Sequence, residues 1–456
     1  MARLVPASPA WHKGTTVSSA QAEPFVAVRP PTLRSHLRCL AGWLGLVLFP
    51  FAAAAQSHLD LRDEALAAYQ RKDFPTAKSA TEAALALRPD SPRYLRQLAA
   101  LSALTGQASA AVGYLQRLAA LGVTADVERD RDFASLQGSP EFRRAVGALA
   151  ANRQPQGEAT VLAELPGRTG ILEGIAYRAS TGDFFLGDAH HRCIWRRDRA
   201  GRVDRFTVDD EGLLGIFGLA LDETRGLLWA ALSAVPEMEG FTGELDGQAA
   251  LAAFSLATSE LVHLVPVPDD GRAHGLGDLV VGPDGTVYAT DSRAPVIWKL
   301  SPGAEEPQIL AQSPAFGSLQ GLVLEDRILL VADHANGLFT VAVDSGRINA
   351  LATPPQTTLV GLDGLVAIPG GVVAVQNGVD PQRVLQLTLT PGFAAIARVK
   401  VLAANQPHLT DLALITLVNE QPTLIAGAGW EGIDGARLKT PPSRTVRLFQ
   451  VPLSLE

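Results

Sequence analysis

A short motif recurs six times between residues 173 and 414. The copies read EGIAY at 173, FGLAL at 217, GDLVV at 277, QGLVL at 320, DGLVA at 363 and TDLAL at 410. Successive copies begin 44, 60, 43, 43 and 47 residues apart. A period of this length indicates a repeated supersecondary unit rather than one irregular domain.

Each copy continues through a turn into a second apolar run, and most copies have a third. In the third copy, Pro283-Asp284-Gly285 supplies hairpin turn chemistry between two such runs. Short strands separated by Gly, Pro and Asp, with almost no helical pattern, predict blades of a β-propeller. We therefore expect a mainly β fold over residues 159–456, a six-bladed β-propeller. Residues 159–166 would add a strand to the last blade and close the ring, and residues 235–250 would form an insertion.

The segment before the repeat has a different periodicity. Residues 56–125 are rich in Ala and Leu with helical spacing, and two copies align at an offset of 34 residues, which pairs Leu61 with Leu95 and Ala65 with Ala99. This segment resembles a pair of tetratricopeptide repeats, a small N-terminal α-helical domain. Residues 126–158 would hold a capping helix and a linker. The helices are either a spacer or a docking site for a protein partner.

The first 55 residues are typical of a targeting segment. Arg34 and Arg38 precede an apolar run from Cys39 to Phe51, and alanines follow at 52–55. This order predicts a signal peptide with an upstream extension, and the apolar run is shorter than a membrane-spanning helix requires. We expect an exported protein, periplasmic or extracellular, with no membrane span after cleavage.

Charge limits the kinds of binding partner, and the cysteine content limits the possible disulfides. The formal net charge of the chain is −8, so nothing favours binding to nucleic acid. Without residues 1–55 only Cys193 remains, which excludes an internal disulfide, and a lone cysteine on a strand is usually a buried apolar residue.

The propeller interpretation brings distant residues to one axis. The innermost strand of each blade begins beside the central channel, so the first residue of each copy would lie there: Glu173, Phe217, Gly277, Gln320, Asp363 and Thr410. The ends of the second strands would lie on the same face and add Asp188, Asp291, Asp333, Asn377 and Trp430. Five histidines, His190, His191, His274, His334 and His408, also fall in segments assigned to this face.

At these positions the chain resembles the senescence marker protein / gluconolactonase family of six-bladed propellers, which hold one divalent metal ion in the channel. Glu173-Gly174 and Asp363-Gly364 match the EG and DG motifs of that family's metal ligands. Gln320-Gly321 stands where the family has Asn-Gly, and Gly277-Asp278 stands where it has Asn-Asp. The resemblance implies a metal site made by Glu173, Gln320 and Asp363.

Two classes of function follow, and the sequence leaves both open. In the first, Ca²⁺, Mg²⁺, Mn²⁺ or Zn²⁺ would activate water against a lactone or ester, with Asp363, His274, His334 or His408 moving the proton. Substrate would contact Asp188, Phe217, Asp291, Asp333, Asn377 and Trp430. In the second, the propeller would be a non-catalytic module that binds a sugar-like ligand or a protein, with the helices as a docking module.

Overall fold

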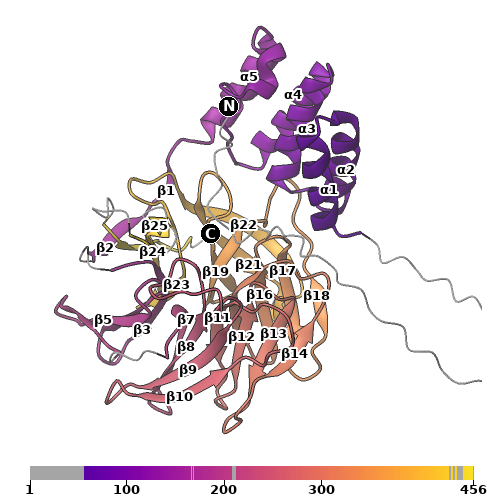
Figure 1. Cartoon of the computed structure of the whole chain (residues 1–456). Coiled ribbons are helices and arrows are strands. Elements are labelled where there is room, and N and C mark those ends of the chain that lie inside the picture. Colours follow the sequence, from indigo (N-terminus) through magenta and orange to yellow (C-terminus); the bar gives the residue numbers. More distant parts are fainter. Residues whose placement is uncertain are drawn as a thin grey trace, which may run out of the picture.

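The computed structural model describes residues 56–165, 167, 169–207, 212–430, 433–434, 437–438 and 445–454. The proposed signal segment lies outside these residues. Among the described helices, none is both long and apolar enough to cross a bilayer. Figure 1 shows helices at one end of a body built from radiating sheets.

The body is a six-bladed β-propeller, as the repeat predicted. The first four blades are the sheets β3–β6 (Leu172–Arg178, Asp183–Asp188, Cys193–Arg197, Val203–Arg205), β7–β10 (Gly215–Asp222, Leu227–Ser233, Ala249–Ser255, Leu261–Pro266), β11–β14 (Leu276–Val281, Val287–Asp291, Val296–Leu300, Gln308–Gln312) and β15–β18 (Leu319–Glu325, Ile328–Asp333, Gly337–Ala342, Ile348–Ala350). The fifth is β19–β22 (Leu362–Ile368, Gly371–Gln376, Arg383–Leu389, Ile396–Ala404). The sixth contains β23 (Ile415–Val418), β24 (Gln421–Ala426) and β27 (Arg447–Gln450). A separate short hairpin joins β25 (Ile433–Asp434) to β26 (Arg437–Leu438).

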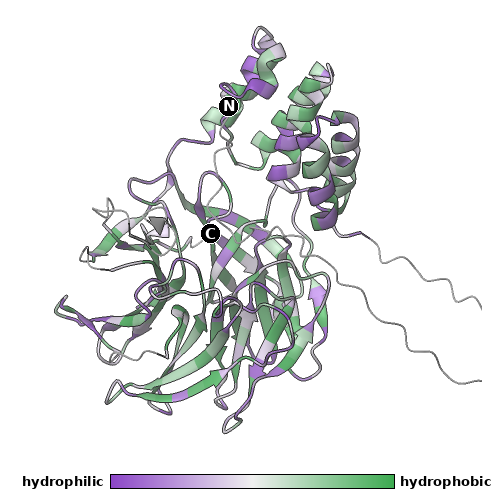
Figure 2. Ribbon diagram, viewed as in Figure 1, coloured by the Kyte–Doolittle hydropathy of each residue, from purple (hydrophilic) through white to green (hydrophobic). Residues whose placement is uncertain are grey.

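The ring closes with a strand from before the first blade. Strand β2 (Thr160–Glu164) pairs antiparallel with β27, which confirms the expected closure, and the innermost strands β23 and β3 are in contact. The sixth blade thus has four strands, with β2 at its outer edge beside β27. Figure 2 shows hydrophobic residues along the strands, and the packed layers between neighbouring blades are apolar.

The innermost strands share a local irregularity that sets the channel lining. In five blades the register shifts by one residue at the motif itself, between Leu172 and Ile175 in the first blade and at the equivalent places in the next four. A β-bulge of this kind turns one extra residue out of the ladder. In each bulge, two residues of the inner strand lie opposite one residue of the second strand. These residue pairs are Glu173-Gly174, Phe217-Gly218, Gly277-Asp278, Gln320-Gly321 and Asp363-Gly364.

The glycines of these pairs have a packing role. A Cβ atom added at Gly174 would lie 1.9 Å from the carbonyl oxygen of Phe217, and one at Gly321 would lie 2.4 Å from that of Asp363. Neighbouring inner strands therefore approach too closely for a side chain at these points. The motif combines a variable residue that faces the axis with a glycine that lets the blades meet.

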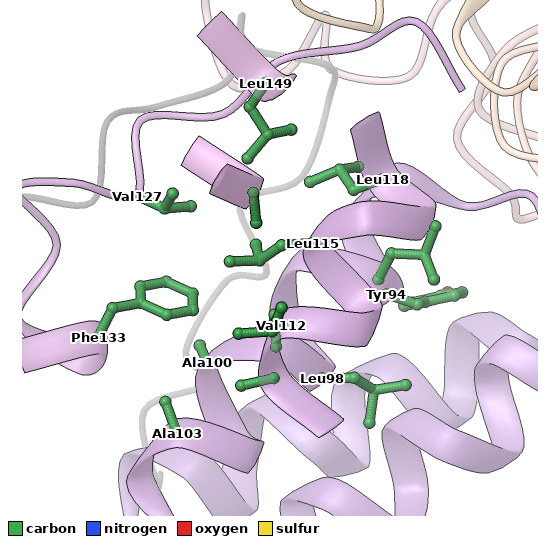
Figure 3. Close-up of a cluster of buried hydrophobic side chains, with 14 of the residues drawn as sticks. Tyr94, Leu98, Ala100, Ala103, Val112, Leu115, Leu118, Val127, Phe133 and Leu149 are labelled. Carbon is green, nitrogen blue, oxygen red and sulfur yellow. The ribbon is translucent and has the colours of Figure 1, made fainter. Parts of the chain in front are cut away.

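The N-terminal segment contains α1 (His58–Gln70), α2 (Phe74–Leu87), α3 (Pro92–Leu104), α4 (Ala108–Ala120), a 3₁₀ helix (Arg131–Leu136) and α5 (Pro140–Ala151). Helices α1 and α3, and likewise α2 and α4, begin 34 residues apart, as the alignment predicted. Side chains of Ser57, Asp73, Ser91 and Ser139 cap four of these helices. Figure 3 shows how Leu115, Phe133 and Leu149 join α4, the 3₁₀ helix and α5 in one apolar core.

The helices dock on the propeller through specific polar contacts. His58 Nε2 lies 2.7 Å from Asn336 Oδ1, and the guanidinium of Arg383 donates to the carbonyl oxygens of Leu121 and Gly122 at 3.2 and 3.3 Å. Past α5, the two-residue strand β1 (Gln156–Gly157) pairs with the outer edge of β22. The helical segment is thereby fixed to the fourth and fifth blades.

Candidate active site in the axial channel

Glu173 lies in the bulge of the first inner strand and faces the channel. The indole Nε1 of Trp430, from the sixth blade, donates a hydrogen bond to its carboxylate. The ring of Phe217 lies 6.5 Å from that of Trp430. Three blades that are remote in sequence thus meet around one acid.

Asp363 occupies the same position in the fifth blade. Its Oδ2 accepts a hydrogen bond of 2.5 Å from Asn377 Nδ2, which also donates to the carbonyl oxygen of Leu412 at 2.9 Å. The imidazole of His334 is bonded to Asn377 in turn. The amide therefore connects the axial acid to a histidine of the fourth blade.

Gln320 contributes an amide from the fourth blade. Its Nε2 donates to Ser318 Oγ at 3.0 Å, and its Oε1 lies beside Gly277, 3.1 Å from where a Cβ would stand. The absence of a side chain at Gly277 leaves room for the amide oxygen. The bond to Ser318 orients the amide, and its oxygen is the atom suited to bind a cation.

Asp278 is an axial carboxylate that the sequence analysis did not single out. It occupies the glycine position of the motif and is 9% exposed. Its carboxylate accepts hydrogen bonds from the backbone N–H groups of Leu279 and Leu322. The signal was present in the third copy, where GD replaces the usual residue-glycine order.

Burial raises the pKa values of all three acids, and the charge of Asp363 adds to the shifts of Glu173 and Asp278. Burial, followed by the nearby charge of Asp363, raises the pKa of Glu173 well above its ordinary value, and the bond from Trp430 opposes this shift. Burial raises the pKa of Asp278 to about 8 and that of Asp363 to about 6. Such carboxylates keep their protons to higher pH than ordinary carboxylates do, unless a cation replaces the proton.

The channel continues below these acids as a cavity of about 230 Å³. Asp278 lines it together with apolar residues of the inner strands, among them Ile175, Leu219, Leu365 and Ile415. Of the three acids, Asp278 is the one that lines this cavity.

The three acids at the ends of the second strands bind the backbone of their own turns. Asp188, Asp291 and Asp333 are fully buried, and each accepts bonds from backbone N–H groups of its own turn. Asp291, for example, accepts hydrogen bonds from the backbone N–H groups of Gly275, Arg293 and Ala294 at 2.9 to 3.0 Å. Their oxygens are occupied in holding the turns, so we assign them no substrate contact.

The three histidines expected to move protons have separate environments. His274 is buried between Asp291 at 2.7 Å and Asp270 at 3.1 Å, and its bond to Asp291 raises its pKa. Burial lowers the pKa of His334, which lies beside Asn377. His408 is exposed in a loop with a positive φ of 65°. Only His334 is connected to an axial acid among these three.

The register of the sixth copy differs from the one expected. The bond from the Ala428 N–H to the Asp411 carbonyl repeats the bond from Ala189 to Ile171 in the first blade. Counting two residues on from Asp411 places Ala413, and not Thr410, at the position of Glu173. The alignment of TDLAL therefore starts three residues too early, and at this position the sixth blade has the apolar side chain of Ala413.

These features define a class: a six-bladed β-propeller with buried carboxylates on its axis. No protein-family model matches the sequence, and no curated protein matches it. Solved structures of similar fold include a PQQ-bound aldose sugar dehydrogenase from Streptomyces coelicolor (16% identity, 66% of this chain, 100% of that chain, TM-score 0.46). A gluconolactonase from Xanthomonas campestris is also similar in fold (16% identity, 66% of this chain, 93% of that chain, TM-score 0.43). So is virginiamycin B lyase from Staphylococcus aureus (13% identity, 65% of this chain, 100% of that chain, TM-score 0.44). At these values the activity has to be argued from the residues themselves.

Proposed function

We propose that the protein is a metal-dependent hydrolase that opens a lactone or ester in the axial channel. One observation carries the proposal: Glu173 and Asp363, 190 positions apart in sequence, face one axis with raised pKa values. Such a pair is stabilised by a shared proton or by a cation between the acids.

The residues fit a divalent cation by the chemistry of their donor atoms. Glu173 and Asp363 offer carboxylate oxygens and Gln320 offers an amide oxygen, a set that favours Ca²⁺, Mg²⁺ or Mn²⁺ and also accommodates Zn²⁺. When bound, the ion would polarise the substrate carbonyl and lower the pKa of a water molecule.

The side chains of this protein supply orientation and proton transfer. Trp430 holds Glu173, and Asn377 holds Oδ2 of Asp363, which leaves the other oxygen of Asp363 to accept the proton of the attacking water. Asp278, with a pKa of about 8, carries a proton at neutral pH and is suited to protonate the leaving alkoxide. The water oxygen then forms the new C–O bond as the old one breaks.

Metal analysis and a hydrolysis assay test this proposal. We expect purified protein to bind a divalent cation that Glu173→Gln and Asp363→Asn both release, and a lactone and ester panel to show turnover that chelator abolishes. The matched control is Glu306→Gln, an exposed acid in the third blade. Turnover that chelator does not reduce, or that neither variant reduces, would refute the proposal.

A second candidate, a non-catalytic binding module, is favoured by the aromatic pair at the rim. Phe217 is buried and backs the partly buried ring of Trp430, on which a sugar-like ligand can stack. Under this alternative, exported protein would bind ligand with its helices docking a protein partner. Ligand binding without turnover, weakened by Phe217→Ala and insensitive to chelator, would favour it over the hydrolase.

A further inference from the structure

A second group of possible metal ligands lies away from the axis. His190 and His191 follow strand β4, and Glu239 lies in the insertion between β8 and β9. The Glu239 Oε1 atom is 3.7 Å from His190 Nε2 and 3.9 Å from His191 Nε2. Among the described residues, this is the one group of three such side chains whose ligand atoms all lie within 4.8 Å of one another.

The opposite nitrogen of each imidazole has a partner that can only accept. His190 Nδ1 lies 2.5 Å from the carbonyl oxygen of Glu237, and His191 Nδ1 lies 2.9 Å from Asp188 Oδ2. Each Nδ1 must therefore carry a hydrogen, and in the neutral ring Nε2 keeps its lone pair. Both lone pairs face Glu239. Histidine ligands of metals commonly have this arrangement, with a carbonyl or carboxylate behind the ring.

The backbone holds the three residues together before any ion binds. Asp188 Oδ1 accepts the N–H groups of His190 and His191 at 3.1 and 2.9 Å, which fixes the turn. The Glu239 N–H donates to the carbonyl oxygen of His190 at 2.8 Å, and Met238 is fully buried in the adjacent core. The insertion is thus anchored on the turn of the first blade.

The distances suit a first-row transition ion with little adjustment. Bonds of about 2.0–2.1 Å to nitrogen and oxygen place tetrahedral ligand atoms roughly 3.3 Å apart. The side chain of Glu239 is 57% exposed and can close the remaining gap, while that of His190 is only 2% exposed and fixed. Two imidazoles and one carboxylate favour Zn²⁺ over Ca²⁺ or Mg²⁺.

We propose that His190, His191 and Glu239 form a Zn²⁺ site that joins the turn of the first blade to the insertion of the second. Asp188 is a positioning residue behind His191. Three protein ligands leave a fourth position for water, on the exposed side of Glu239. The competing explanation is a metal-free ion pair between Glu239 and a protonated histidine.

Titration of chelator-treated protein with Co²⁺, and competition by Zn²⁺, test the site. We expect one equivalent of Co²⁺ to give visible absorption typical of four-coordinate nitrogen and oxygen ligation, which Zn²⁺ displaces. Glu239→Gln and His191→Gln should weaken this binding at least tenfold. The controls are Glu244→Gln, from the same insertion, and His263→Gln, an exposed histidine on β10.

The axial variants separate this site from the proposed active site. Glu173→Gln and Asp363→Asn should leave the Co²⁺ spectrum intact, so either site can fail without the other. In the Glu173→Gln background, where the axial site is impaired, Zn²⁺ should also raise the Tm, and the additional change Glu239→Gln should remove this rise. No such spectrum, or a spectrum that both site variants retain, would overturn the proposal and leave the ion pair.

Discussion

Trp430 donates its indole N–H to the carboxylate of Glu173, although 257 residues separate them. The bond stabilises the ionised acid against the burial that raises its pKa. This hydrogen bond also links the sixth blade to the first, where the ring of blades closes.

Replacement of Trp430 by Phe should weaken cation binding at the axis. The aromatic ring remains, but the N–H that favours the ionised form of Glu173 is lost, so the pKa of Glu173 should rise further. Loss of a residue that orients a metal ligand typically costs about 10–100-fold in affinity. Calorimetric titration with Ca²⁺ and Mn²⁺ measures this. The matched control is Trp229→Phe, since Trp229 Nε1 has no hydrogen-bond partner among the residues that the structure describes; equal effects of both changes would contradict the expectation.

Asp278→Asn should change how stability depends on pH. In metal-free protein the pKa of Asp278 is about 8, above its ordinary value of 3.8, so the folded state binds this proton more tightly than the unfolded state does. Its contribution is full below about pH 4 and is lost as pH rises through about 8.

Thermal unfolding in chelator between about pH 5 and 9 measures this contribution. A tenfold difference in proton affinity between the folded and unfolded states corresponds to about 1.4 kcal/mol, so the Asn variant should exceed the parent Tm at pH 8 by several degrees and show a flatter profile. Asp344→Asn, at an exposed acid, should keep the parent slope. Parallel profiles for parent and Asp278→Asn would show that this carboxyl is not buried as described.

Asp291→Ala should destabilise the third blade. Its carboxylate accepts from three backbone N–H groups, from Trp298 Nε1 at 3.1 Å and from His274 at 2.7 Å. Leaving these buried groups unpaired should cost about 2–4 kcal/mol in the free energy of unfolding. Urea denaturation measures it. Asp246→Ala, with a 52% exposed side chain, should cost no more than about 1 kcal/mol.

Arg383→Met should loosen the helical segment. Arg383 is 5% exposed, and its guanidinium binds the carbonyl oxygens of Leu121 and Gly122 across the junction, while Nε donates to Gln376 Oε1 at 2.6 Å. Without these bonds the linker should open more often, and trypsin should cut after Arg153 at least roughly threefold faster. Arg347→Met, at an exposed arginine, serves as the control. Unchanged cleavage in Arg383→Met would mean that other contacts hold the helices.

The sequence by itself determined the periodic features of the fold. The repeat gave six blades, the 34-residue offset gave the spacing of four helices, and the run at 159–166 gave the closing strand. Placing Glu173 and Asp363 on one axis needed only the register of each copy, because identical blades put equivalent positions at equivalent places. These features depend on local periodicity, so the sequence alone was enough to predict them.

Tertiary structure decided which polar groups are free. The sequence pattern predicts that Asp188, Asp291 and Asp333 face the channel. In the structure, their carboxylate oxygens instead accept hydrogen bonds from backbone N–H groups of the turns. Asp278 reaches the axis because one bulge places it there, and Ala413 replaces Thr410 because the sixth inner strand pairs three residues later. The contact of His190 and His191 with Glu239 depends on an insertion that folds back across blades. Bulges, turns and long-range closure depend on partners far along the chain, so no local pattern specifies them.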